Sequence, residues 1–262
     1  MTSTKLKISI VIPTRNQAAF ITRCLDQCLA QNVEHCQIIV QDGASTDNTP
    51  AILKQYGNRI EAISEPDAGQ SDALDKGIAR SDGDIIAWIN SDDFYPTNDV
   101  LSRVIKTFES DPTIDIVYGH AKLVNVSGNV LRTYPVQRID PLSKLLTYPV
   151  SPLCQPAVFF KRELYNKTGG IDRNLHLTMD HDLWLRMFPL AIKTQMIQHV
   201  LAHVTSHPDA KSVHQAKQQF QELWHVKQRY IKQYQLRWFD RLHMRLGHWK
   251  NMIYAATQRF WS

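Results

Sequence analysis

The chain has 262 residues, a length that suits one α/β domain of roughly 200–250 residues with an appendage, or two small domains. Hydrophobic residues make up 43% and charged residues 21%, a composition that excludes a disordered, collagen-like or coiled-coil protein. The net charge of +5 is unevenly placed, because residues 211–262 carry 10 Lys and Arg against 2 Asp and Glu, whereas residues 1–210 carry 20 against 23. Such asymmetry indicates a partner that is a membrane surface or a nucleic acid.

The first 64 residues alternate strand and helix patterns. Residues 7–14 and 37–41 are rich in β-branched side chains and predict strands, and a helical pattern occupies 17–31 between them. Pro50 suits the first turn of a second helix, and a short third strand is predicted at 60–64.

The alternation continues through residue 134. The pattern predicts a helix at 68–80, an apolar strand at 84–90, a helix at 99–109, and a strand at 115–124 that pairs through a turn with 130–134. A strand that is apolar throughout is typical of a parallel sheet covered on both faces. Strands separated by helices of this length predict βαβ units with right-handed crossovers, and therefore an α/β fold.

Acidic residues gather just after the predicted strands. In a parallel sheet the ligand lies beyond the carboxyl ends of the strands, so these segments are the candidate site. A crevice lined by carboxylates repels an anion, and an anionic ligand there would need Mg²⁺ or Mn²⁺, which take oxygen ligands. An Asp in this position can instead cap the next helix. We expect a cap for Asp47 and Asp99, but not for Asp92 and Asp93. These two adjacent acids follow the apolar strand, and the segment FYP (94–96) delays the next helix.

Six segments, taken together and in order, resemble glycosyltransferase family 2. They are VIPTRN (11–16), VQDGASTDNT (40–49), EPDAGQSDALDKGI (65–78), GDIIAWINSDDFY (83–95), GGID (169–172) and MDHDLWLR (179–186). The resemblance implies the glycosyltransferase A fold, a Rossmann-like mixed and mostly parallel sheet flanked by helices. It also implies a nucleotide-sugar donor, a divalent metal (Mn²⁺ or Mg²⁺) and inverting transfer. Because it ends near residue 207, we expect a catalytic domain at 1–210 and a basic amphipathic helical tail at 211–262.

The resemblance also assigns residues to the donor. It implies that the nucleotide sugar is bound by Pro13, Thr14, Arg15, Asp42, Asp67, Gln70, Asn90, Ser91 and Asp93. Asp42 matches an acid that accepts a hydrogen bond from uracil, which favours a UDP-sugar. Asp92 matches a metal ligand in the family's Asp-x-Asp position, with His207 as a further metal ligand or a diphosphate contact. The sequence departs from the family at Asn90, where an amide replaces the first acid and brings no charge.

The segment MDHDLWLR supplies the catalytic carboxylate by the same resemblance. Asp180 matches the general base and Asp182 is the alternative, while Met179 stands where the family usually has Glu. Inverting transfer needs one base, which removes the proton of the acceptor hydroxyl as it attacks the anomeric carbon. Gln155 matches a position on the acceptor side, where Asp182 and Trp184 are also candidates. Trp184 could stack on a sugar there or belong to the core.

The pattern of residues 211–262 predicts amphipathic helices. Five apolar residues fall within an arc of roughly 80° on a helix, with arginines on the other side; they are Phe239, Leu242, Leu246, Trp249 and Ile253. Four tryptophans lie in the same segment, namely Trp224, Trp238, Trp249 and Trp261. Such helices can lie in a membrane interface, or pack on the catalytic domain or on a second copy in a homo-oligomer. The chain lacks zinc-finger, helix-turn-helix and RNP patterns, so we expect no nucleic-acid partner.

The absence of targeting and membrane-spanning patterns indicates where in the cell the protein lies. The first residues have no apolar run with a cleavage site, no stretch approaches 18 apolar residues, and four cysteines are too few for a disulfide framework. We therefore expect a cytoplasmic protein that can lie on the inner face of the cell membrane.

The sequence thus predicts an inverting, metal-dependent enzyme. It would transfer a hexose or N-acetylhexosamine from a UDP-sugar to a hydroxyl of a lipid-linked or polysaccharide acceptor. Asn90 and Met179 motivate an alternative, a catalytically inactive nucleotide-sugar-binding homologue that serves as an assembly partner. A dinucleotide-dependent oxidoreductase is disfavoured, because no G-x-G-x-x-G follows the first strand.

Overall fold

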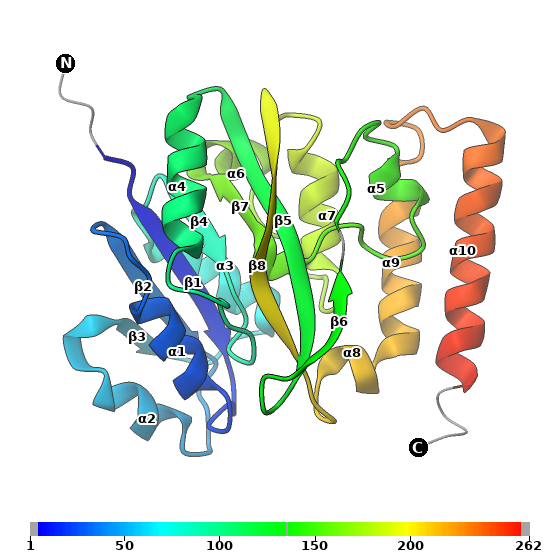
Figure 1. Ribbon diagram of the computed structural model, residues 1–262. Coiled ribbons are helices and arrows are strands. Elements are labelled where there is room, and N and C mark those ends of the chain that lie inside the picture. The colour runs from blue at the N-terminus through cyan, green and yellow to red at the C-terminus, as the bar shows by residue number, and fades with distance from the viewer. Residues whose placement is uncertain (1–4, 135, 258–262) are drawn as a thin grey trace.

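The computed structural model describes residues 5–134 and 136–257, so Trp261 lies outside the described residues. One mixed sheet runs through the molecule in the order β3-β2-β1-β4-β7-β5-β6, and β8 pairs with β5. Helices flank this sheet, and α9 and α10 lie side by side at one end of the molecule (Figure 1). The predicted α/β fold with a mixed, mostly parallel sheet is confirmed.

The four strands of the first hundred residues are parallel to one another. They are β1 (Ile8–Thr14), β2 (Cys36–Asp42), β3 (Glu61–Ser64) and β4 (Ile85–Trp88). The helices that connect them are α1 (Ile21–Leu29), α2 (Thr49–Gln55), the 3₁₀ turn η1 (Gly57–Arg59) and α3 (Gln70–Arg80). Because the strands are parallel, their carboxyl ends meet at one edge of the sheet, which is where the acidic segments gather.

The remaining strands run in both directions. Helix α4 (Val100–Ser110) leads to β5 (Ile114–Asn125), which pairs antiparallel with β6 (Val130–Tyr134) as the sequence predicts. Two strands were not predicted: β7 (Val158–Lys161) lies antiparallel between β4 and β5, and β8 (Lys193–Ser206) runs parallel to β5. The intervening helices are α5 (Lys144–Thr147), η2 (Gln155–Ala157), α6 (Arg162–Thr168) and α7 (Met179–Met187).

Apolar layers cover both faces of the central strands. Along β1, Ile10 and Ile12 point into the layer shared with α1 and α4, whereas Val11 points into the layer shared with α3 and α7. Alternate residues of β4 divide in the same way, with Ala87 on the first side and Trp88 on the second. Burial on both faces explains why β4 is apolar throughout. It also holds the strands in place, and the residues that follow them project from the edge of the sheet.

The two acids expected to cap helices behave differently. Asp47 Oδ1 accepts the backbone N–H of Thr49 at 2.9 Å, but Asn48 occupies the N-cap position of α2, so Asp47 binds the first turn from one residue before the predicted cap. Asp99 stands at the N-cap position of α4 but makes no capping hydrogen bond. Its carboxylate instead accepts from Thr97 Oγ1 and pairs with Arg103, so the predicted cap is wrong there.

Three helices follow the sheet. They are α8 (Lys211–His214), α9 (Ala216–Tyr230) and α10 (Trp238–Thr257). Helix α9 packs against α7, and α10 packs against α9 and α5. Val226 and Met244 belong to the same buried cluster as Trp184 of α7. The boundary at residue 210 stays a prediction that rests on motif content, because the helices beyond it share this core.

Among residues 5–134 and 136–257, no helix has the length and hydropathy needed to cross a bilayer.

Candidate functional site

A cleft of about 520 Å³ opens at the carboxyl ends of β1 and β4. Its walls come from the loops after β1, β3 and β4, from η2, from the start of α7, and from the end of β8 with α8. Twelve of the residues selected from the sequence line it, namely Pro13, Thr14, Arg15, Asp67, Gln70, Asn90, Ser91, Asp92, Asp93, Gln155, Asp180 and His207. The fold therefore brings together segments that are up to 194 positions apart, between Pro13 and His207.

Asp92 and His207 form a pair in this cleft. The Nε2 atom of His207 lies 3.1 Å from Asp92 Oδ2. The imidazole is buried and its ring centroid lies 4.3 Å from that of Phe20, while Nδ1 has no hydrogen-bond partner among the described residues. The pair combines a carboxylate with an imidazole, and both groups are ligands that divalent metals take in proteins.

Asp93 also lines the cleft, but its side chain is buried and its carboxylate is bound by the protein itself. It accepts the backbone N–H of Thr205 at 3.0 Å and lies 3.5 Å from Asn90 Nδ2. Burial, and next the charge of Asp92, raise the pKa of the Asp93 carboxyl well above its usual value. Asp93 thus ties the loop after β4 to the end of β8, and in doing so it fixes where Asp92 stands.

The amide of Asn90 is fully engaged. Its Oδ1 accepts from Gln70 Nε2 at 2.8 Å and from Trp88 Nε1 at 3.1 Å. A carboxylate at this position would have no N–H to offer Asp93 and would add a charge beside it. The replacement of the family's acid by an amide is therefore consistent with the buried, acidic surroundings of residue 90.

Lys211 continues the series of hydrogen bonds that joins Asn90 to Gln70. Its Nζ donates to Gln70 Oε1 at 3.0 Å. Desolvation lowers the pKa of the lysine, whereas the nearby carboxylates of Asp92 and Asp67 raise it. The cleft therefore contains a cation opposite its acids. Sequence reasoning did not select Lys211, and the only signal was its position four residues after His207.

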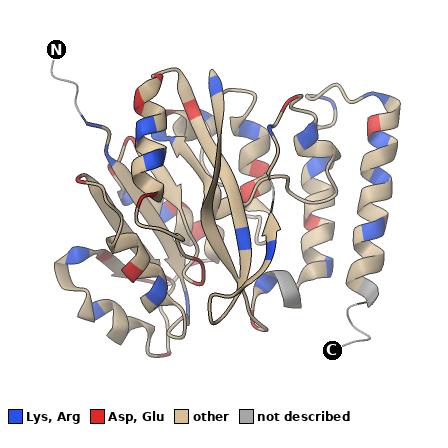
Figure 2. Cartoon of the chain, viewed as in Figure 1, with Lys and Arg blue, Asp and Glu red and all other residues tan. Residues whose placement is uncertain are grey.

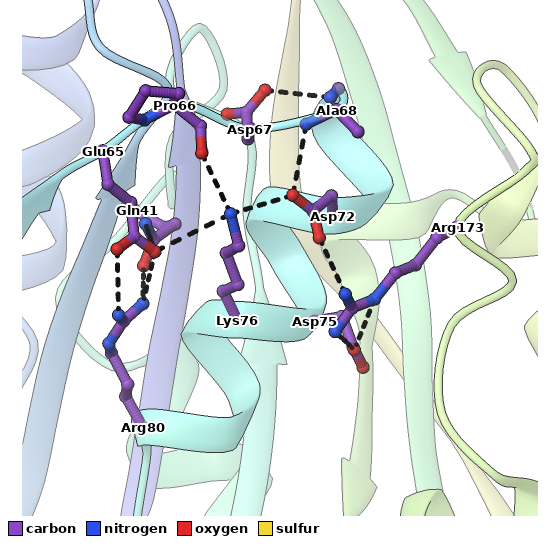
Figure 3. A network of polar contacts seen from close by, with 11 residues as sticks. Gln41, Glu65, Pro66, Asp67, Ala68, Asp72, Asp75, Lys76, Arg80 and Arg173 are labelled. Carbon is purple, nitrogen blue, oxygen red and sulfur yellow. Dashed lines mark hydrogen bonds and ion pairs between the residues drawn. The ribbon is translucent and has the colours of Figure 1, made fainter.

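The loop that carries Asp67 is held by charges on α3. Figure 3 shows Asp72 accepting the backbone N–H of Ala68 at 3.1 Å and pairing with Lys76 and with Arg173. Asp67 Oδ1 in turn accepts the backbone N–H of Gly69 at 2.9 Å. The helix and loop are thus one unit, which keeps Asp67 and the following Gln70 at the cleft wall.

Asp42 does not reach the cleft. Its side chain is fully buried, and its two oxygens accept from the hydroxyls of Ser45 and Ser64 and from the backbone N–H of Ser45. Every donor in this set comes from the protein itself. The structure therefore does not present Asp42 to a ligand, and its implied contact with a uracil is not supported by this geometry.

Asp180 lies at the start of α7, where it lines the cleft. Desolvation raises the pKa of its carboxyl to about 6, and this shift exceeds the opposing effect of backbone hydrogen bonds. A carboxylate near this pKa can both bind and release a proton close to neutral pH, which is the requirement for a general base.

Glu222 of α9 holds the loop that precedes Asp180. Its carboxylate accepts from the backbone N–H groups of His176, Leu177 and Thr178 at 2.8–3.1 Å, and from Thr178 Oγ1 at 2.9 Å. Sequence reasoning missed this role, because no pattern links residues 44 positions apart. The C-terminal helices therefore help to build the site as well as covering the core.

Asp182 and Trp184 do not line the cleft, and the structure corrects their predicted place on the acceptor side. Asp182 pairs with Arg186 Nη2 at 2.7 Å and accepts from the hydroxyl of Tyr230 at 2.7 Å. Trp184 is fully buried against Phe160. Residues 180 and 182 stand about 200° apart on a helix, so only one of the two acids can face the cleft.

The fold and this acidic cleft at the strand ends define a protein of the glycosyltransferase A class. Residues 9–169 match the family model described as "Glycosyl transferase family 2", and the chain belongs to this family.

Curated relatives agree with this assignment. An uncharacterized glycosyltransferase of Rickettsia conorii is 28% identical over 191 residues, which are 70% of this chain and 32% of the relative. A chondroitin synthase of Pasteurella multocida is 28% identical over 183 residues, 69% of this chain and 18% of the synthase. The chain thus spans about a third of the length of the first curated relatives it matches.

Two solved structures share the fold. S. aureus TarS in complex with UDP-GlcNAc has a TM-score of 0.70 at 14% identity, covering 86% of this chain and 67% of TarS. A mannosyltransferase from Pyrobaculum calidifontis in complex with GDP-Man and Mn²⁺ has a TM-score of 0.70 at 18% identity, covering 98% and 74%.

Proposed function

We propose that this protein is an inverting glycosyltransferase that uses a UDP-sugar. It moves a hexose or N-acetylhexosamine to a hydroxyl of a lipid-linked or polysaccharide acceptor. One observation carries the proposal: a single cleft holds a carboxylate with a raised pKa, Asp180, and the Asp92–His207 pair. The first group suits proton removal from an acceptor, and the second suits the anionic leaving group of a nucleotide sugar.

Relatives support a polysaccharide acceptor and a nucleotide-sugar donor. The matched proteins include synthases named for chondroitin and hyaluronan, which are polysaccharides. The two structural neighbours hold UDP-GlcNAc and GDP-Man, so this fold accommodates either nucleoside. The choice of UDP rests on the family resemblance at Asp42, whose side chain is buried, and the donor screen distinguishes UDP-sugars from GDP-Man.

The metal proposal rests on the donor set around Asp92. Among the described residues no group of three or more His, Cys, Asp and Glu side chains could hold a metal ion by itself. Mg²⁺ in nucleotide sites is commonly bound by one or two carboxylates together with substrate phosphates. Asp92 and His207 would hold a Mn²⁺ or Mg²⁺ ion of that kind together with the donor diphosphate. When bound, it would supply Lewis-acid stabilisation of the departing diphosphate.

The chain's own residues perform the remaining tasks. Asp180 accepts the proton of the acceptor hydroxyl as that oxygen attacks the sugar. Lys211 places a positive charge near the position proposed for the diphosphate. Gln155 lines the cleft, where its Nε2 donates to the carbonyl of Trp88 at 2.5 Å and its buried Oε1 has no partner among the described residues.

A donor screen tests the proposed function. UDP-Glc, UDP-Gal, UDP-GlcNAc, UDP-GalNAc and GDP-Man are each incubated with the protein, with and without Mn²⁺. Calorimetry measures binding, and release of the nucleoside diphosphate measures turnover. We expect turnover of at least one UDP-sugar, stimulated by Mn²⁺. Absence of both binding and turnover with every donor contradicts the proposal.

The alternative function is a nucleotide-sugar binder without catalysis. Asn90 and Met179 favour it, since each replaces an acid that the family usually has at that position. The same screen separates the two, because the binder would take up a UDP-sugar in calorimetry and release no nucleoside diphosphate even with acceptor present.

Replacing Lys211 by methionine is expected to weaken donor binding by about ten- to a hundredfold, the effect of losing one charge-assisted contact. Methionine keeps the length of the side chain and removes its charge. Calorimetry with the donor identified in the screen measures the change. Lys217→Met, at an exposed position on α9, is the matched control and should bind as the wild type does. Equal affinity of Lys211→Met and wild type would remove Lys211 from the proposed site.

A further inference from the structure

Helix α10 has two distinct faces. The inner face packs on α9 and α5 through the buried residues Met244, Gly247 and Ala255. It is further held by Asn251, whose Nδ2 donates to the carbonyl of Pro149 at 2.8 Å. In Figure 1 the helix forms one end of the molecule, so its other face points away from the protein. The orientation of the helix is therefore set by specific contacts.

The outer face carries a stripe of large apolar side chains. Six of them, between 41% and 76% exposed, make up this outer stripe: Trp238, Phe239, Leu242, Leu246, Trp249 and Ile253. At 100° per residue they occupy an arc of roughly 100°. Single exposed apolar residues are common on proteins, whereas a contiguous stripe with two tryptophans indicates a surface that is covered by a partner.

Basic residues border the outer stripe. Arg241 and Arg245 lie along one flank of the stripe and not, as predicted from the sequence, on the opposite side of the helix, and Lys250 lies along the other flank. All three are exposed, and Figure 2 shows that Lys and Arg predominate on this helix. Residues 211–262 contain two acids. Glu222 is engaged by the loop before α7, and Asp240 accepts from Arg237 Nε at 3.2 Å. The surroundings of the stripe are therefore cationic, and its partner should be anionic.

This charge pattern decides between a second copy and a bilayer. Two copies that packed stripe against stripe would place arginines and lysines near one another, without a free acid on this helix to neutralise them. In an anionic bilayer, the apolar stripe can be buried at the boundary of the hydrocarbon layer, and the flanking cations can bind the lipid phosphates above it. Tryptophan suits that boundary, because its ring is apolar and its N–H is polar.

We propose that α10 lies in the interface of an anionic lipid bilayer, with the outer stripe buried and with Arg241, Arg245 and Lys250 at the lipid phosphates. Helix α9 takes no part, because its apolar residues Leu223 and Val226 are buried within the protein. The membrane surface predicted for residues 211–262 is thereby narrowed to one face of one helix. The proposal does not depend on glycosyl transfer, because a protein without activity would bind lipid in the same way.

Co-sedimentation with vesicles tests it. The full chain is mixed with vesicles of phosphatidylcholine, with and without phosphatidylglycerol. Removing the tail would be a poor control, because Glu222 of α9 holds the loop before Asp180. Point variants are used instead: Leu246→Glu and Trp249→Glu on the stripe, and Leu131→Glu, exposed on β6, as the matched control.

We expect the wild type and Leu131→Glu to sediment with the anionic vesicles. Each stripe variant should bind at least about tenfold more weakly, from the loss of one buried apolar side chain. Arg241→Gln and Arg245→Gln should each cost about fivefold on anionic vesicles, from the loss of one lipid-facing charge. Unchanged thermal melting of the variants shows that they fold.

Three results would overturn the proposal. They are absence of wild-type binding to anionic vesicles, equal binding of Leu246→Glu and wild type, and a dimer in ultracentrifugation that Leu246→Glu dissolves without any lipid binding by the wild type. The last result would assign the outer stripe to a second copy of the chain.

Discussion

The Asp180→Asn protein is expected to transfer sugar about 10²–10⁴-fold more slowly than the wild type, the usual contribution of a general base. Asparagine has nearly the same shape and cannot accept the proton of the acceptor hydroxyl. Donor binding should be unchanged, because the side chain acts on the acceptor. The rate is measured as release of nucleoside diphosphate with saturating acceptor, and donor affinity by calorimetry.

Asp182→Asn is the matched control for this experiment. The same substitution two residues along α7 weakens the pair with Arg186 and the hydrogen bond from Tyr230, and leaves the cleft intact. We expect a lower melting temperature and a rate close to that of the wild type. If Asp182→Asn lost activity while Asp180→Asn kept it, the assignment of the base would be reversed.

The pH dependence of transfer gives a second readout of Asp180. A base must be ionised to accept a proton, and the pKa of the Asp180 carboxyl is raised to about 6, mainly by desolvation. The rate should therefore fall as the pH is lowered through about 6, and should level off above it. The Asp180→Asn protein should lack this limb in its pH–rate profile, and an unchanged limb would place the titrating group elsewhere.

Replacing Asp92 by asparagine is expected to remove most of the stimulation by Mn²⁺, and to lower the rate by about 10²–10³-fold for a loss of roughly 3–4 kcal/mol of charge stabilisation. Asn keeps an oxygen at the position of Asp92 Oδ2 but removes the charge beside His207. Electron paramagnetic resonance of Mn²⁺ with UDP present measures metal binding separately from turnover.

The control for Asp92 is Asp209→Asn, which removes one acid from the exposed rim of the same cleft. Its rate and Mn²⁺ affinity should remain close to those of the wild type. A similar loss in both variants would mean that the overall acidity of the cleft matters. A wild-type Mn²⁺ response in Asp92→Asn would mean that the metal, if used, is held elsewhere.

Much of the cleft could be predicted because it is made of strand ends. β1 and β4 are short and apolar, so their boundaries are visible in the sequence, and the residues that follow them must project at one edge of a parallel sheet. Asn90 and Asp92 are examples, since their place in the cleft follows from the strand before them. Asp180 and His207 were found through the family resemblance, because no local pattern points to them.

Other assignments depended on contacts that a sequence does not display. Asp42 also stands at the carboxyl end of a strand, yet Ser45 and Ser64 bind its carboxylate. Trp184 lies on the same helix as Asp180, and the turn of that helix directs it into the core. Local sequence cannot distinguish an acid or an aromatic that faces the ligand from one that faces its own protein.

The α/β alternation, the acidic strand ends and the basic charge of the last fifty residues can be recognised in the chain before it folds, because each is a local pattern of residue types. The set of side chains that share the cleft, the hold of Glu222 on the loop before Asp180, and the exposure of the apolar stripe on α10 became known from the folded protein. Burial and hydrogen bonding depend on pairs of segments, and a local pattern describes one segment at a time. The segments that pack against a charge or a tryptophan settle whether it is buried or exposed. Glu222 and Tyr230, which bind the loop before Asp180 and the side chain of Asp182, lie more than forty positions along the chain from those partners.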